Sequence, residues 1–453
     1  MLLNIPAGAR ELLSRLTACG HQAYVVGGCV RDSLLGREPK DWDICTSAAP
    51  EEMVQAFSGL RVVDTGLKHG TLTVVIDHTP YEVTAFRVDG AYTDHRHPDS
   101  VTFVTDVRQD LARRDFTVNA MAYHPDTGLV DAFGGQEDLR RGIIRCVGDP
   151  TARFTEDALR ILRALRFASV YDFTIDPDTA SAIHALHPTL SRVAPERIRA
   201  ELDKLLCGAG VRRILRAYAD VITGLLLEMQ PCVGFDQRTP FHRFDVWEHT
   251  VRAVEQVPPT AVLRLTMLLH DAGKPACFSL DEEGVGHAYG HPAVSRDLAE
   301  QVLSRLRYDN ATRDRVLTLV TWHDRKLDDD PRRLTRRLNQ LGEETLRQLL
   351  EVHRADNLAK GTAVPAEVEG WYQRTRSALQ ALLDSHPCFT LRDMAVRGGD
   401  LSAAGIPPGR ALGACLQALL EQVMAGALPN EKDALLAWAR AWAEQHKHDR
   451  TGG

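Results

Sequence analysis

Between residues 22 and 148, apolar positions come in short runs separated by turns. Runs of this kind, rich in β-branched and aromatic residues and bounded by glycine, proline or aspartate, are typical of strands. They read AYVVGG, DWDICT, HGTLTVVID, YEVTAFRV, VTFVT, GLVDAF and IIRCVG. One or two helices interrupt them, so this part of the chain is predicted to be an α+β domain with a mixed sheet.

After Asp149-Pro150 the apolar residues recur at helical spacing, and they do so to the end of the chain. The first twenty residues, MLLNIPAGARELLSRLTACG, predict an amphipathic helix rather than a signal peptide. Breaks that contain proline and glycine divide the helical region. We therefore expect a head at 1–148, a helical neck at 149–222, a helical body at 223–360 and a helical tail at 361–453.

Composition excludes several classes of protein. The chain has 453 residues, enough for about three domains, and it contains no run of about 18 apolar residues, so no membrane span is expected. A net charge of −7 argues against a protein that coats nucleic acid indiscriminately, although a local basic groove is compatible with it. Nine cysteines without a C-x-x-C motif indicate unlinked thiols in a reducing cytoplasm.

The first polar cluster is GGCVRDSLLGREPKDWDI, which begins at Gly27 and places a glycine turn and a short helix before an extended segment. Residues two apart in a strand share a face, so Asp41 and Asp43 are predicted to point the same way, with Trp42 and Ile44 toward the core. Neighbouring carboxylates repel each other unless a cation lies between them. The pattern predicts a Mg²⁺ site facing a turn whose backbone N–H groups hold phosphate oxygens. A solvated acidic loop is the alternative.

The second cluster is RRDFTVNAMAY, in which Asp115 and Asn119 would share one face of a predicted helix. Arg114 suits triphosphate oxygens, and the Asp or Asn side chain can bond ribose hydroxyls. A surface ion pair of little energetic value is the alternative.

The third cluster is DPTARFTEDALRILRALRFAS, predicted to form a helix that begins at Thr155. On it, Asp157 would accept from an exocyclic amine while Arg160 donates to the adjacent ring nitrogen. That arrangement fits cytosine and adenine and rejects guanine and uracil. Arg163 and Arg166 continue the three-residue spacing and would surround the base and triphosphate. The alternative is a salt-bridged surface.

In the predicted body, histidines and aspartates follow in the order H…HD…H…H…D. They are His249, His270, Asp271, His291, His323 and Asp356. Imidazole and carboxylate together form the ligand set of hydrolytic metal centres, so we expect these dispersed residues to converge on one divalent metal site. Lys274 would lie near a bound phosphate. The basic run RRLTRR, residues 332–337, either meets RNA phosphates or is a solvated surface.

These motifs, in uninterrupted order over at least residues 22–206, resemble the bacterial tRNA nucleotidyltransferases (CCA-adding enzymes) and poly(A) polymerases of the DNA polymerase β superfamily. GGCVRDSLLGREPKDWDI resembles their catalytic motif, RRDFTVNA their ribose-selecting motif, EDALRILRALRFA their base-selecting motif and RVAPERIRAEL the neck motif after it. The histidine–aspartate series resembles the HD phosphohydrolase domain of some members.

The resemblance implies that Asp41 and Asp43 hold two Mg²⁺ ions and that Glu82 is either a third carboxylate or a structural residue. The residues implied to contact the nucleotide are Gly28, Arg31, Arg114, Asp157, Arg160, Arg163 and Arg166.

The implied function is template-independent addition of CCA to tRNA 3′ ends from CTP and ATP, with an HD domain that hydrolyses phosphate esters. The segment 86–101 resembles a flexible loop that CC-adding members lack, which disfavours CC-only addition. Three alternatives stay open: an A-adding enzyme or poly(A) polymerase, a non-catalytic RNA-binding protein, and an HD hydrolase with a vestigial head.

Overall fold

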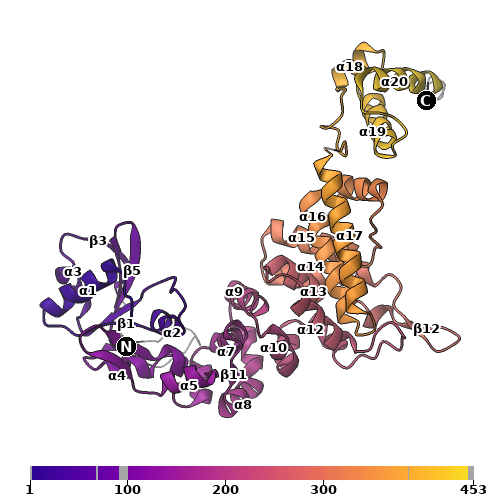
Figure 1. Cartoon of the computed structure of the whole chain (residues 1–453). Helices are drawn as coiled ribbons and strands as arrows, with labels where there is room; N and C mark the ends of the chain where they lie inside the picture. The colour runs from indigo at the N-terminus through magenta and orange to yellow at the C-terminus, as the bar shows by residue number, and fades with distance from the viewer. Residues whose placement is uncertain (1–2, 68–69, 91–99, 386, 447–453) are drawn as a thin grey trace. The chain divides into compact units, whose positions relative to one another are not determined.

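The computed structural model describes residues 3–67, 70–90, 100–385 and 387–446. The chain divides into two compact units (Figure 1). The first unit comprises residues 1–233, 259–261 and 301–309, and the second comprises 234–258, 262–300 and 310–453.

A seven-stranded sheet forms the N-terminal part of the first unit, in the order β3-β4-β5-β2-β1-β8-β9. Its strands are β1 (Ala23–Val26), β2 (Ile44–Thr46), β3 (Arg61–Gly66), β4 (Thr71–Ile76), β5 (Thr79–Ala85), β8 (Met121–His124) and β9 (Gly128–Asp131). Only β2 and β5 pair in parallel; the other neighbours are antiparallel. The predicted mixed sheet is therefore confirmed.

The apolar run of β1 lies near the middle of the sheet because its side chains are covered on both sides. Val25 and Val26 are buried, and Val25 lies opposite Ile44 on one neighbouring strand and Tyr123 on the other. The acidic residues before Ile44 therefore stand at the end of a strand that is fixed in the sheet.

Helices pack around this sheet: α1 (Ala7–Ala18), α2 (Gly28–Leu34), α3 (Pro50–Ala56), α4 (Val107–Ala112) and α5 (Gly135–Arg141). Short strand pairs complete the region, with β6 (Arg87–Asp89) against β7 (Val101–Phe103) and β10 (Ile143–Ile144) against β11 (Thr174–Ile175). The predicted N-terminal amphipathic helix corresponds to α1, which buries Ala9, Leu12, Leu13 and Leu16.

Two predictions of secondary structure are wrong here. The segment RRDFTVNAMAY is not one helix: α4 ends at Ala112, a 3-10 turn covers Thr117–Asn119, and Met121 starts strand β8. The pairing of β8 with β1 and β9 outweighs a helical spacing of polar residues. The second error is that strand β3 was not predicted. Its sequence, RVVDTG, does not alternate between apolar and polar residues as a half-buried strand does.

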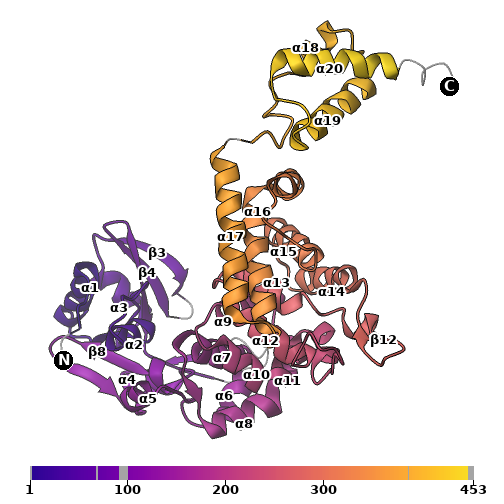
Figure 2. The ribbon, with the colours of Figure 1, turned by 45° about the vertical axis from the view of Figure 1, so that its right-hand side comes forward.

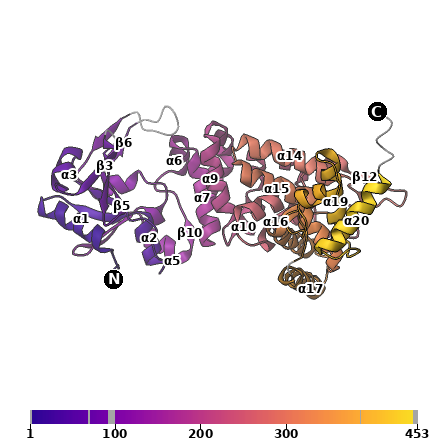
Figure 3. The same cartoon turned by 90° about the horizontal axis from the view of Figure 1, so that it is seen from above.

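Helices follow the sheet for the rest of the first unit: α6 (Pro150–Glu156), α7 (Leu159–Tyr171), α8 (Pro177–Leu186), α9 (Pro195–Leu206), α10 (Val211–Ala217) and α11 (Ala219–Leu225). Helices α7 and α9 lie side by side, as Figure 3 shows. The helix predicted to begin at Thr155 is interrupted. Thr155 lies inside α6, and Asp157 adopts an extended conformation before α7 starts.

The second unit is almost entirely helical. Its helices include α12 (Val246–Gln256), most of α13 (Ala261–Leu269) and of α14 (His291–Arg305), α15 (Asn310–Trp322), α16 (Pro331–Ala359) and α17 (Pro365–Asp384), with the small hairpin β12 (Ser279–Leu280) and β13 (Gly286–His287). Helix α17 runs along α16 (Figure 2), and α16 is interrupted at Gly342, which has a φ of 74°.

The last helices are α18 (Gly398–Ala403), α19 (Arg410–Met424) and α20 (Lys432–Gln445). They enclose their own core, which includes Leu401, Leu419 and Leu435. None of the helices in the described part of the chain has the length and hydropathy needed to cross a membrane.

Candidate functional site: an acidic pair, an arginine network and a histidine–aspartate cluster

Asp41 and Asp43, the acidic pair, precede strand β2 and are both exposed, whereas Ile44 is buried. Partial desolvation, together with the negative charges of Glu82 and Asp41, raises the pKa of Asp43 to about 6, against the opposing effect of Arg114. The carboxylates are therefore close enough to disfavour one another's charge. A divalent cation relieves this repulsion, and an all-oxygen donor set suits Mg²⁺.

Glu82 lies on β5 and is exposed. Within the residues that the structure describes, it does not join Asp41 and Asp43 in a set whose ligand atoms all lie within 4.8 Å. Its electrostatic effect on Asp43 places it near the acidic pair without making it part of a compact ligand cluster.

The glycine turn lies against two arginines. Gly27 has a φ of 78°, and a Cβ there would lie 2.9 Å from Nη1 of Arg114, so a side chain would collide with the guanidinium. Gly28, the predicted contact residue, begins α2, and a Cβ there would lie 3.6 Å from Arg31, which is ordinary packing. Of the two glycines, the structure requires Gly27 more strictly.

A buried polar network runs from α2 into α7. Arg31 donates to both carboxylate oxygens of Asp32, at 2.9 and 3.1 Å, and to Oδ1 of Asn119 at 2.5 Å. Asn119 in turn donates to Asp115 at 3.0 Å, so the predicted contact between these two side chains exists although no helix creates it. Arg163 donates to Oδ2 of Asp115 at 2.8 and 2.6 Å.

Burial alone would raise the pKa of Asp115, but Arg163 and Asn119 outweigh it and hold the pKa at about 2. Asp115 is therefore a fixed negative charge at ordinary pH. Its two-pronged bond to Arg163 joins the 115–119 segment to helix α7.

The ring of Phe167 is the apolar support of this network. Three guanidinium groups lie over it, with Arg166 at 3.9 Å, Arg31 at 4.9 Å and Arg163 at 5.4 Å from the ring centroid. Arg166 also pairs with Glu201 of α9 at 2.6 Å. The ring and the carboxylates together hold the arginines near one another despite their like charge.

At the start of α7, Asp157 accepts from the backbone N–H of Leu159 at 3.0 Å and from Arg197 of α9, also at 3.0 Å. Arg160 donates to Glu156 at 2.5 Å and to the carbonyl oxygens of Arg153 and Arg113. A carboxylate offers about four acceptor positions and a guanidinium five N–H groups. Both side chains thus keep capacity for one further partner.

The second unit brings all six histidines and aspartates of the sequence pattern together. His249 lies on α12, His270 and Asp271 directly follow α13, His291 begins α14, His323 directly follows α15, and Asp356 lies on α16. We call these six residues the histidine–aspartate cluster. Apart from Asp356, which is half-buried, its members are buried.

The cluster consists of two ligand sets that share one residue. His249, His270, Asp271 and Asp356 form the first set, and Asp271, His291 and His323 form the second. Oδ2 of Asp271 faces the first set, 3.3 Å from His249 and 3.2 Å from His270, while Oδ1 faces the second, 3.3 Å from His291 and 3.5 Å from His323. Sequence order alone could not reveal this division.

The spacing of these atoms fits metal coordination. A tetrahedron with metal–ligand distances of ~2.0–2.1 Å has edges of roughly 3.3 Å. The Nε2 atoms of His249 and His270 are 3.2 Å apart, and Nε2 of His249 lies 3.0 Å from Oδ1 of Asp356. The Nε2 atoms of His291 and His323 are likewise 3.2 Å apart.

Backbone carbonyls determine which nitrogen faces inward. Nδ1 of His270, His291 and His323 lies 2.7 to 2.8 Å from the carbonyl oxygens of Met267, Ala288 and Val320, respectively. A carbonyl only accepts, so Nδ1 carries the proton and the neutral ring turns an Nε2 lone pair toward the cluster. Two such lone pairs, on His291 and His323, face each other, which suits a cation between them.

The charges of the cluster lead to the same conclusion. Burial would lower the pKa of His270, but Asp271 and Asp356 outweigh it and raise the pKa to about 9. The carboxylates therefore favour a positive charge among the ring nitrogens. Nitrogen and oxygen ligands of this kind suit a divalent transition metal better than Mg²⁺.

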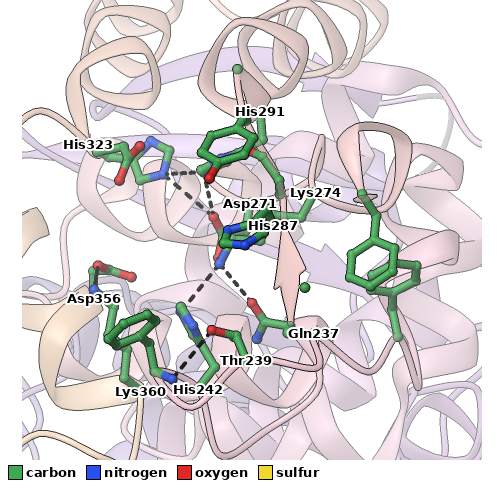
Figure 4. Close-up of a pocket in the computed structure, with 18 residues that line it drawn as sticks. Gln237, Thr239, His242, Asp271, Lys274, His287, His291, His323, Asp356 and Lys360 are labelled. Carbon is green, nitrogen blue, oxygen red and sulfur yellow. Dashed lines mark hydrogen bonds and ion pairs between the residues drawn. The ribbon is translucent and has the colours of Figure 1, made fainter. Parts of the chain in front are cut away.

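A cavity opens onto the cluster, and its walls include Asp271, His291, His323 and Asp356 (Figure 4). Nζ of Lys274 lies 2.7 Å from Asp271 and 2.9 Å from Gln237, and Nζ of Lys360 lies 3.0 Å from Asp356. Lys274 thus lies beside the cluster, and its role toward a bound phosphate stays a prediction.

Several residues of these sites were missed in the sequence. Glu201 and Arg197, in the stretch PERIRAEL, bind Arg166 and Asp157, and Lys360 follows Asp356 by one helical turn. Each lies in or beside a quoted motif, but its partner comes from a distant segment, so spacing alone gave no signal. The sequence predicts a flexible loop over residues 86–101. Residues 91–99 of that segment lie outside the described part of the structure.

The basic run 332–337 forms the first turns of α16. Arg337 lies over the ring of Trp322 at 4.8 Å, and Arg325 lies over the same ring at 4.3 Å. Its role toward RNA stays a prediction.

Comparison with known proteins adds the family. Residues 23–145 match the model of the poly A polymerase head domain, and residues 292–439 match a model of tRNA nucleotidyltransferase domain 2. The chain is 38% identical to the CCA-adding enzyme of Levilactobacillus brevis, over 95% of this chain and 96% of the relative. It is 34% identical to the CCA-adding enzyme of Geobacillus stearothermophilus, over 95% of each.

The fold agrees with solved structures. The crystal structure of the Bacillus stearothermophilus CCA-adding enzyme in complex with CTP superposes with a TM-score of 0.72 at 30% identity, covering 97% of this chain and 98% of that one. The Thermotoga maritima CCA-adding enzyme complexed with tRNA shares the fold, with a TM-score of 0.56 at 22% identity, over 97% and 96%. With near-complete coverage in sequence and in fold, this chain belongs to the CCA-adding enzymes, a family of tRNA nucleotidyltransferases.

Proposed function

We propose that this enzyme adds C, C and A to the 3′ end of tRNA, with CTP and ATP as substrates. The observation that supports this most is that the acidic pair, the glycine turn and the arginine network belong to one unit of a chain that matches CCA-adding enzymes over 95% of its length. Nine free cysteines suit action in the cytoplasm.

In this proposal Asp41 and Asp43 hold the catalytic Mg²⁺. When bound, such ions align the attacking 3′-hydroxyl and stabilise the pyrophosphate leaving group. Arg31 and Arg114 line the glycine turn and neutralise the triphosphate. Because Arg31 is already fixed by Asp32 and Asn119, it binds phosphate with little loss of side-chain freedom.

We further propose that Asp157 and Arg160 select the base. The acceptor capacity left on Asp157 meets the exocyclic amine of cytosine or adenine, and an N–H of Arg160 meets the neighbouring ring nitrogen. Guanine and uracil present the opposite pattern. Arg163 and Arg166 act on the same pocket by adding positive charge near the triphosphate.

An incorporation assay tests the proposal directly. The protein is incubated with tRNA that lacks the CCA end, tRNA that ends in CC, and complete tRNA, with each nucleoside triphosphate separately. We expect C on the first, A on the second and nothing on the third. Addition of A alone would instead identify an A-adding enzyme, and no addition at all would favour a binding protein.

We propose a second activity for the histidine–aspartate cluster, which is hydrolysis of phosphate esters at damaged tRNA 3′ ends, either terminal phosphates or 2′,3′-cyclic phosphates. The two ligand sets that share Asp271 support it, because each would offer nitrogen and oxygen ligands to a divalent ion that activates water. In the reaction, water forms the new P–O bond, the ester P–O bond breaks, and the proton passes to the leaving oxygen.

We retain the division into head, neck, body and tail as a proposal. The two activities would then lie on different parts of one chain, with the body preparing ends that the head extends. Release of phosphate from a tRNA with a 3′-phosphate, followed by addition of CCA to the same molecule, would support this order.

A further inference from the structure

The cavity beside the histidine–aspartate cluster carries more than metal ligands and cations. Its volume of about 260 Å³ is many times the ~10–15 Å³ that one water needs. Its walls also include aromatic side chains, among them Phe241 and Tyr289. A site for inorganic phosphate alone would need neither this space nor these rings.

Phe241 and Tyr289 are unusual in their exposure. They are 69% and 77% exposed, the two highest values among the large hydrophobic side chains in the described part of the chain. Single exposed apolar residues are common on protein surfaces. Here, however, both of the most exposed ones line the same cavity, next to candidate metal ligands.

The Tyr289 ring is braced from one side. The imidazole of His287 stacks on it nearly in parallel, with centroids 5.0 Å apart and an angle of 8°. Asp281 anchors that imidazole at 2.8 Å. A ring supported on one face and still 77% exposed suits stacking by a planar ligand.

We propose that this cavity binds a nucleoside phosphate, with its phosphate at the histidine–aspartate cluster and its base stacked on Tyr289 beside Phe241. Lys274 and Lys360 supply positive charge at the phosphate end. The inference rests on the proposed hydrolase activity and adds to it a site that holds the nucleobase next to the phosphate. The nucleoside comes either from a free mononucleotide or from the last residue of an RNA.

The test compares two substrates on the full-length protein with the same divalent metal: adenosine 3′-monophosphate, which has a base to stack, and p-nitrophenyl phosphate, which has no nucleobase. Tyr289→Ala should raise KM for the nucleotide by roughly fivefold to a hundredfold, the usual effect of removing one stacking ring. Its kcat and its hydrolysis of p-nitrophenyl phosphate should change little, and Phe241→Ala should act in the same direction.

Two matched variants act as controls. Tyr289→Phe keeps the ring and should keep the KM of the unaltered protein. Leu280→Ala removes another exposed apolar side chain of the same unit, one that does not line the cavity, and should change neither substrate. Equal KM values for Tyr289→Ala and the unaltered protein would overturn the inference.

The outcomes separate this inference from the function on which it rests. If neither substrate is hydrolysed with any of Mn²⁺, Co²⁺, Ni²⁺ or Mg²⁺, the hydrolase proposal fails. Equilibrium dialysis then tests the inference separately, by measuring binding of adenosine 3′-monophosphate to the unaltered protein and to Tyr289→Ala. Binding that is lost in Tyr289→Ala supports the inference, and any other result overturns it. A short RNA with a 3′-phosphate distinguishes the sources, because only a terminal-residue site gives it a lower KM than the mononucleotide.

Discussion

The two candidate sites of this chain place their charges in opposite ways. In the sheet-containing unit the carboxylates expected to hold metal are exposed, while the arginine network behind them is bonded to fixed partners. In the second unit the expected ligands are themselves buried and already at coordination spacing. Mg²⁺ commonly takes only one or two protein carboxylates and completes its shell with substrate phosphates and water. Under the proposed function, the first site would need its nucleotide to complete the metal shell, whereas the second offers several buried ligands from the protein alone.

The largest effects should come from the acidic pair. We expect Asp43→Ala and Asp41→Ala each to abolish nucleotide addition without lowering the thermal midpoint, because both side chains are exposed and the raised pKa of Asp43 means that its charge is disfavoured in the fold. Single-turnover incorporation of CTP on tRNA lacking CCA, beside a melting curve, measures both. A rate within about tenfold of the unaltered enzyme, under ~1.4 kcal/mol of barrier, would contradict the metal assignment.

Asp271, the carboxylate that both ligand sets of the histidine–aspartate cluster share, allows the corresponding test of the second site. Asp271→Ala removes a ligand from both sets at once, so we expect loss of phosphate hydrolysis and of both bound metals, with CCA addition to intact tRNA spared. His291→Ala affects only the second set and should leave one metal. Metal analysis after dialysis gives the count, and equal metal content in the two variants would argue against a bridging role for Asp271.

The two residues proposed to select the base should show smaller, selective effects. Asp157→Ala and Arg160→Ala are expected to reduce discrimination of CTP and ATP against UTP and GTP by roughly tenfold to a hundredfold, since one good pair of bonds to a base is worth ~1–3 kcal/mol. Arg197→Ala frees Asp157 without removing it and should have a milder effect. Steady-state kinetics with all four nucleotides measure this discrimination. Unchanged discrimination in Asp157→Ala and Arg160→Ala would mean that Asp157 and Arg160 form only surface ion pairs.

The smallest expected effect concerns stability in acid. The pKa of Asp115 falls from an ordinary 3.8 to about 2 in the folded chain, because Arg163 outweighs its burial. A lowered pKa stabilises the fold above pH ~4 and loses that contribution as pH falls from about 4 to 2, in total about 2 kcal/mol. Urea unfolding between pH 2 and 5 should show this slope in the unaltered protein and a shallower one in Asp115→Asn. Equal slopes would contradict the assignment.

The sheet was predictable because its buried strands are apolar and separated by turn residues. AYVVGG and HGTLTVVID became β1 and β4 for that reason. Strand β8 was not, since its pairing with β1 depends on residues far away in sequence, although β9, its other neighbour, follows it directly. The helical interpretation of the 113–123 segment relied on local spacing, which tertiary pairing overrides.

The candidate sites show the same limit. The order of histidines and aspartates in the sequence predicts that these residues converge. It does not predict that they form two ligand sets that share Asp271. The break at Asp157 was equally hidden, because TEDALR contains neither proline nor glycine. What accompanies the break is a bond from α9, through Arg197, to the Asp157 carboxylate.

The break between α6 and α7 separates two acidic residues that are neighbours in sequence, Glu156 and Asp157. Glu156 belongs to α6 and forms ion pairs with Arg153 and Arg160. Asp157 instead forms an ion pair with Arg197 on α9. A rotation of α9 would therefore pull on one carboxylate and leave the other in place. In the proposed base pocket, the separation of Asp157 and Arg160 would thus follow the position of α9, because Asp157 is bound to Arg197 of α9 and Arg160 to Glu156 of α6.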